Sequence, residues 1–196
     1  MGLINTFESF NTFWKERNYG MQLDEAKEKF IQAWGALGSN WGINRTMAQV
    51  HALLLISPGA LSAEDIMASL DISRGNANMN LRALIDWGLV NKVHRTGERR
   101  EYFAAEKDIW QVAQQVITER RKRELKPVLK VLDELRSLPD VPSSTERDAF
   151  VDAVENLAGI VEKADQFLEV VVQSDKKWFF EQLFRLVPAR SEDTLR

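Results

Sequence analysis

The 196-residue sequence predicts a mainly α-helical protein that contains a winged helix-turn-helix, with further helices on both sides of it. Residues 44–105 have the pattern of three short helices followed by a β-hairpin, which is the order of elements in that motif. Apolar residues before and after this stretch recur at helical spacing. We therefore expect N-terminal dimerisation or packing helices at 1–43, the winged domain at 44–106, a long helix at 107–138 and a C-terminal helical dimerisation region at 139–196.

The N-terminal region carries two amphipathic helical patterns. Their apolar residues are Leu3, Phe7, Phe10 and Trp14 in the first, and Phe30, Ile31, Trp34 and Leu37 in the second. Because glycine commonly follows the last turn of a helix, we expect the second helix to end near Gly38. Neither helix has an apolar partner within its own segment.

Local signals place the second and third helices of the motif. Pro58-Gly59 marks a turn, and the run Ser62–Asp65 is a capping box in which each end satisfies a free backbone donor of the other. A short turn around Asp71 leads to Ser73, a good N-cap. The third helix should then stop at Gly88.

The third helix has one apolar and one polar side. The apolar stripe consists of Ala77, Leu81, Leu84 and Ile85. The rest of the surface carries Arg74, Gly75, Asn76, Asn78, Met79 and Arg82. Amide groups can pair bidentately with adenine and guanidinium groups with guanine, and both also bond phosphate oxygens. Gly75 adds close access to the backbone. This side of the helix therefore predicts contact with duplex DNA.

The hairpin that follows is the predicted wing. Residues 89–93 and 101–104 have the pattern of paired strands, joined across a turn that carries Arg95, Arg99 and Arg100. Arginine on a projecting hairpin can enter a narrow minor groove, where the negative potential is enhanced. The wing should extend the DNA contact beyond the major groove.

Beyond the wing, helical patterns continue to the C-terminal region. Pro127 should kink or split the long helix. Residues 139–144 have the composition of a linker, and an amphipathic helix through Phe150–Val171 and a short helix at 176–186 follow. These flanking helices carry more apolar surface than a small winged domain can cover, so we expect a homodimer that presents two third helices to successive major grooves.

Charge is unevenly distributed along the chain, and the composition argues against a membrane or secreted protein. The net charge is -3, yet residues 44–130 carry 14 basic and 10 acidic side chains, whereas residues 131–196 carry 8 and 14. The run Glu119–Glu124 is expected to be a solvated helix face, with contact to flanking phosphates as the alternative. No apolar run approaches the roughly 20 residues that span a bilayer, and Met1–Asn18 lacks the pattern of a secretory signal.

Other features exclude further classes. The absence of cysteine fits a cytoplasmic protein. Because we expect this protein to contact DNA, we also expect it to be associated with the nucleoid. The two histidines, His51 and His94, make no metal site, and we expect no cofactor. A glycine-rich phosphate loop, a nucleophile elbow and a histidine–carboxylate arrangement are all missing, so an enzyme is not predicted. A winged domain that serves as a protein–protein adaptor is the alternative, and its binding should depend little on salt.

Four runs of residues resemble the GbsR branch of the MarR-type bacterial regulators. They are Trp41–Thr46, Leu70–Leu84, Trp87–Val90 and Gly97–Phe103, and the match is best over residues 24–110. The resemblance implies a dimeric transcription factor, often a repressor, in which a small ligand bound near the junction of the dimer helices and the winged domains alters their spacing. Members of the branch include regulators of the uptake or synthesis of glycine betaine and choline.

The resemblance also assigns residues. It implies DNA contacts by Ser73, Arg74, Asn76, Asn78 and Arg82 of the third helix and by Arg95, Arg99 and Arg100 of the wing. A quaternary ammonium effector would need an aromatic cage. The tryptophans available for such a cage are Trp14, Trp34, Trp41, Trp87 and Trp110. Each also lies at helical spacing with other apolar residues, which is the pattern of core or dimer packing.

Overall fold

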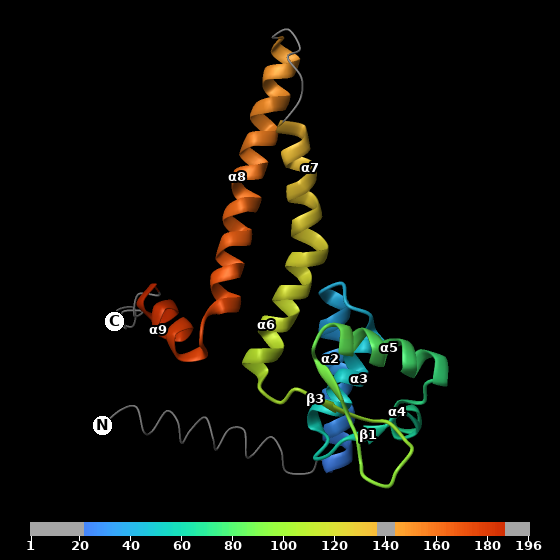
Figure 1. Cartoon of the computed structure of the whole chain (residues 1–196). Coiled ribbons are helices and arrows are strands. Elements are labelled where there is room, and N and C mark those ends of the chain that lie inside the picture. The colour runs from blue at the N-terminus through green and yellow to red at the C-terminus, as the bar shows by residue number, and fades with distance from the viewer. Residues whose placement is uncertain (1–21, 137–143, 187–196) are drawn as a thin grey trace, which may run out of the picture. The chain divides into compact units, whose positions relative to one another are not determined.

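The computed structural model describes residues 22–136 and 144–186 (Figure 1). The chain divides into two compact units, Met1–Ala105 and Glu106–Arg196. The described residues are mainly helical, and the strands among them form one small antiparallel sheet. The predicted helix through Leu3 and Trp14 and the predicted linker at 139–143 lie outside the described residues.

The first unit has a winged-helix-like order of elements. Between residues 22 and 105 its helices are α2 (Leu23–Asn40), α3 (Arg45–Ile56), α4 (Ala63–Leu70) and α5 (Arg74–Asp86), and its strands are β1 (Leu61–Ser62), β2 (Val90–Val93) and β3 (Tyr102–Ala105). The sheet order is β1-β3-β2, with Leu61 opposite Phe103 and Val90 opposite Ala105. The two-residue strand β1 was not predicted. Its pairing with β3 ties the turn before α4 to the wing.

One apolar core joins these elements. Its largest fully buried side chains are Val50 and Leu54 of α3, Ile66 of α4, Leu81 and Leu84 of α5 and Val90 of β2. The predicted inner stripe of α5 is confirmed at Ala77, Leu81 and Leu84, which are buried. Because the stripe faces the core, the opposite side of α5 is left at the surface.

The predicted caps hold α4 and α5 in place. At the capping box, the backbone N–H of Ser62 donates to the Asp65 carboxylate at 2.9 Å, and the N–H of Asp65 donates to the Ser62 hydroxyl at 3.2 Å. The Ser62 N–H and then its hydroxyl lower the pKa of Asp65, because both donate to the ionised form. Asp71 takes the left-handed conformation between the helices, at φ 51°. Ser73 then caps α5.

The predicted helix end near Gly38 lies within two residues of the observed end, but Gly38 itself does not stop the helix. Helix α2 continues to Asn40, and Gly38 is buried inside it. A Cβ at Gly38 would lie 2.6 Å from the Cβ of Ala48, so this glycine permits the close approach of α2 and α3. The chain turns instead at Gly42, where φ is +73°.

The second unit is helical in its described part. It contains α6 (Ile109–Arg120), a π-helical segment η1 (Arg121–Leu125), α7 (Lys126–Arg136), α8 (Thr145–Gln173) and α9 (Lys176–Leu186). The predicted break at Pro127 takes the form of this wide turn. Proline has no N–H, and its ring crowds the carbonyl group one turn earlier in a helix. Just before Pro127 the backbone forms a wider π turn, in which Lys126 N–H donates to Arg121 C=O.

Helix α7 packs against α8, and the two run side by side in Figure 1. Leu132, Val154 and Ala158 form the buried cluster between them. A second apolar stripe of α8 lies exposed beside this face. Its members, at alternating spacings of three and four, are Phe150, Ala153, Leu157, Ile160, Ala164 and Phe167. Ile160 is 68% exposed and Phe167 is 63% exposed, so the described part of the unit leaves this stripe in contact with solvent.

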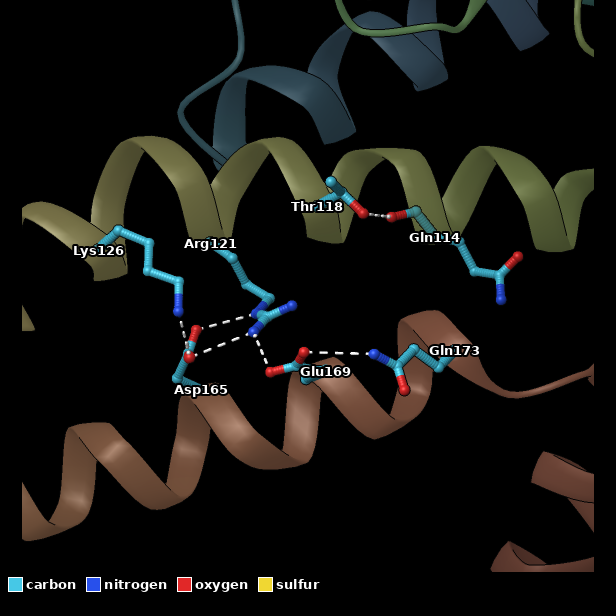
Figure 2. A network of polar contacts seen from close by, with 7 residues as sticks. All are labelled: Gln114, Thr118, Arg121, Lys126, Asp165, Glu169 and Gln173. Carbon is cyan, nitrogen blue, oxygen red and sulfur yellow. Dashed lines mark hydrogen bonds and ion pairs between the residues drawn. The ribbon is translucent and has the colours of Figure 1, made fainter.

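A polar network joins η1 to α8 (Figure 2). Asp165 accepts two hydrogen bonds from Arg121, at 2.9 and 3.2 Å, and one from Lys126 at 2.8 Å. Arg121 also donates to Glu169 at 3.0 Å. The Arg121 guanidinium and then the Lys126 ammonium lower the pKa of Asp165 from 3.8 to about 2.

The interpretation of Glu119–Glu124 as a solvated face is therefore wrong for two of its members. Glu119 is buried and accepts from Arg123 at 3.1 Å, and the side chain of Arg121 is 12% exposed in its pair with Asp165. The run crosses the π turn, where Arg121 lies against α8. Lys122, Arg123 and Glu124 are exposed as expected.

Two kinds of feature are absent from the described residues. Within 22–136 and 144–186, none of the helices is both long and apolar enough to cross a bilayer. In the same ranges, histidine, aspartate and glutamate side chains form no group of three suited to a metal ion.

Candidate nucleic-acid interface

The exposed side of α5 is the first half of the candidate interface. Ser73 accepts a hydrogen bond from Asn76 N–H at 3.3 Å and so fixes the first turn of the helix. The structure places most of the predicted contact residues on the surface of this helix. Ser73, Arg74, Gly75, Asn78, Met79 and Arg82 are exposed, and Asn76 is half-buried.

Two residues of this surface, Arg74 and Asn76, are in contact with other side chains of the same chain. The Arg74 guanidinium lies 3.4 Å from a Glu64 carboxylate oxygen, a long surface ion pair that contributes little energy and can open for another acceptor. The amide of Asn80, which is buried, donates to the backbone and side-chain oxygens of Asn76 at 2.9 and 2.7 Å. This second contact holds Asn76 in one orientation. The sequence pattern gave no signal for a buried Asn80.

Met79 adds an apolar side chain to this surface, and Gly75 leaves the backbone uncovered. Met79 is 58% exposed, and no heavy atom lies within 4 Å of a Cβ placed on Gly75. A large exposed side chain and a bare backbone on one helix face allow close contact with a flat ligand edge. Among residues 73–82, the only charged side chains are Arg74 and Arg82.

The wing between β2 and β3 is the second half of the interface. Its turn closes through a hydrogen bond from Glu98 N–H to Arg95 C=O at 3.2 Å, with Gly97 at φ +86°. Arg99 and Arg100 follow the turn and are exposed. Arg95 is also on the surface, but its guanidinium donates to the Ala60 carbonyl at 3.1 Å.

Acidic residues near the wing are each held by a partner. Lys92, 2.6 Å from Glu101 across the hairpin, lowers the pKa of that carboxyl. Glu98 accepts a hydrogen bond from the Tyr102 hydroxyl, and this bond raises the pKa of Tyr102. The two carboxylates are therefore engaged within the hairpin, while Arg99 and Arg100 extend the basic character of α5.

The tryptophans expected to be available for an effector cage fall into different surroundings. Trp34 stacks on Phe30, with ring centroids 5.6 Å apart, and Trp110 packs on Phe179 at 4.9 Å. Trp41 is 58% exposed and Trp87 is buried. Trp14 lies outside the described residues.

Comparison with known proteins supports the fold. No protein-family model and no curated protein sequence matches the chain. The crystal structure of a transcriptional regulator is similar, with a TM-score of 0.59 and 19% sequence identity. The match covers 80% of this chain and 99% of that chain, so the likeness extends over almost the whole of the regulator. At this identity the likeness shows a shared fold.

Proposed function

We propose that this chain is a DNA-binding transcriptional regulator, and more specifically a homodimeric repressor of the GbsR branch of the MarR-type regulators. The observation that carries the proposal is the surface of α5, which bears Arg74 and Arg82 with the exposed amide of Asn78 and the half-buried amide of Asn76, beside a wing that exposes Arg99 and Arg100. The shared fold with a transcriptional regulator supports the same conclusion.

In the proposed complex, α5 enters the major groove. Arg82, Asn78 and Met79 contact base edges or thymine methyl groups, because arginine and amide side chains pair with purine edges there. Ser73, Arg74 and Gly75 lie at the helix N-terminus, where free N–H groups and the helix dipole favour a phosphate. Arg99 and Arg100 of the wing reach the neighbouring minor groove.

The partner in the proposed dimer is a second copy, packed on the exposed stripe of α8. Alternating spacings of three and four are the pattern of helices that pair along their length. The stripe runs from Phe150 to Phe167 and includes two alanines, which let two helices approach closely. A two-fold dimer would read two half-sites about 34 Å apart, and hence a pseudo-palindromic operator.

Selection of genomic DNA fragments by the purified full chain at moderate salt tests this function. We expect enrichment of a two-fold symmetric site. No enrichment of any duplex sequence would contradict the proposal and favour a protein–protein adaptor. On the recovered site, Arg82→Ala should cost about 1 to 3 kcal/mol if Arg82 reads a base, and should weaken all sequences alike if it binds only phosphate.

Salt dependence tests the wing separately. Replacing both Arg99 and Arg100 with alanine should reduce the slope of log affinity against log salt by about 0.9 for each phosphate that the wing no longer neutralises. The matched control replaces Lys29 and Lys130, which are exposed on α2 and α7, with alanine. The control should keep the slope of the unmodified protein. An unchanged slope and affinity in the arginine variant would remove the wing from the proposed interface.

A further inference from the structure

The guanidinium of Arg95 is held by its own chain. Its Cζ lies 3.9 Å from the centroid of the Tyr102 ring, a cation–π contact, and one of its terminal nitrogens donates to the Ala60 carbonyl at 3.1 Å. Tyr102 is in β3 and Ala60 precedes β1. Arg95 therefore joins the start of the wing turn to the returning strand and to the segment that leads into α4.

The other side of the same turn is held by the same tyrosine. The Tyr102 hydroxyl donates to the Glu98 carboxylate, and Glu98 N–H closes the turn on Arg95 C=O at 3.2 Å. Tyr102 is 8% exposed, so its ring is fixed in the sheet and offers one face and one polar end to the turn. Arg95, Glu98 and Tyr102 thus form one closed set of contacts, which we call the wing brace.

The wing brace separates the three arginines of the wing. The Tyr102 hydroxyl holds the Glu98 carboxylate at the turn by a hydrogen bond. Arg95 uses its cation within the protein, whereas Arg99 and Arg100 are exposed and make no hydrogen bond or ion pair with another side chain of residues 22–136 and 144–186. The three wing arginines are therefore not equivalent.

We propose that Arg95 is a positioning residue, which orders the wing so that Arg99 and Arg100 reach DNA, and that it makes no DNA contact itself. This proposal rests on the proposed DNA-binding function for its effect on affinity. Its structural part does not, because the wing brace orders residues 94–101 in the free protein as well. The two parts can be tested independently.

Hydrogen exchange of the DNA-free full chain tests the structural part. Arg95→Ala should speed amide exchange in residues 94–101 several-fold, because the turn is then without two of its anchors. Arg99→Ala should leave exchange in the same peptide unchanged. Equal exchange in Arg95→Ala and the unmodified protein would overturn the proposal, whatever the chain does with DNA.

A double-mutant cycle on operator affinity tests the functional part. Arg95→Ala should weaken binding about tenfold, since it removes one cation–π contact and one charged hydrogen bond. The same change in a Tyr102→Leu background should cost clearly less than tenfold, because the cation–π contact is already gone and only the hydrogen bond to Ala60 remains to be lost. In a Tyr102→Phe background, which keeps the ring, the loss should stay close to tenfold.

The opposite pattern would overturn the proposal. If Arg95 bound phosphate directly, Arg95→Ala would cost the same factor in all three backgrounds and would lower the salt slope by about 0.9. Should Tyr102→Leu fail to fold, the exchange measurement on the DNA-free chain still decides whether Arg95 orders the wing. If neither the unmodified protein nor any variant bound duplex DNA, the proposed function would be wrong. The exchange measurement would still test whether the wing brace orders the turn.

Discussion

Replacing Asp165 with asparagine removes the carboxylate that joins the π-helical segment to α8. Lowering a carboxyl pKa from 3.8 to about 2 corresponds to about 2 kcal/mol of extra interaction with the ionised form. Removal of one partner from a buried ion pair commonly costs about 3 to 5 kcal/mol, because the other charge is left uncompensated. Arg121 keeps Glu169 at 3.0 Å, and Lys126 is more than half exposed, so we expect the smaller figure of about 2 kcal/mol.

The pH dependence of this contribution has a definite sign. Because the folded-state pKa of Asp165 lies below the value of 3.8 in an unfolded chain, its stabilisation is complete above about pH 4. It is lost as the pH falls from about 4 toward 2, where the folded protein also binds the proton. Asp165→Asn should remove this component of the acid sensitivity.

Urea unfolding of the full chain, followed by far-ultraviolet circular dichroism at one protein concentration, measures both effects. The matched control is Asp152→Asn, which changes an exposed carboxylate of the same helix and should alter stability by less than about 0.5 kcal/mol. Equal stabilities of the two variants at neutral pH would refute the reasoning. So would an unchanged loss of stability between about pH 4 and pH 2 in Asp165→Asn.

Three further changes test other parts of the structure. Ser62→Ala removes the capping box of α4 and should cost about 1 kcal/mol in denaturant unfolding. Gly38→Ala forces a Cβ to 2.6 Å from that of Ala48 and should lower the free energy of unfolding by about 1 to 3 kcal/mol. Gly75→Ala places its Cβ in open space and should leave the thermal unfolding temperature unchanged or raise it. Phe167→Lys should dissociate the proposed dimer in sedimentation analysis without unfolding the monomer; a dimer of unchanged affinity would exclude this stripe.

Local signals in the sequence predicted much of the first unit. The capping box at Ser62, the cap at Ser73 and the helix stop at Gly88 each depend on residues within about four positions, and all three are confirmed. The inner stripe of α5 follows from helical periodicity alone. Such features need no knowledge of the rest of the fold.

Features that depend on distant residues were not predictable. Gly38 looks like a helix stop in isolation, and only its closeness to Ala48 shows that it lies at a helix crossing. Arg121 meets Asp165 across 44 positions, so the sequence indicated only a charged run. The same limit applies to Arg95, because its role within the wing depends on the position of the Ala60 carbonyl, 35 residues away.

The wide turn at η1 makes this segment the place where the long helix can change its length by one residue. A π turn holds about one residue more than an α turn, so Arg121 and Lys126, five positions apart, both reach Asp165. Deleting the exposed Lys122 would leave these two residues four apart, which is the spacing of neighbours on a regular α-helix. Helix α7 would then keep Leu132 against Val154 and Ala158. Deleting the equally exposed Lys130 instead would rotate Leu132 by about 100° and out of that cluster.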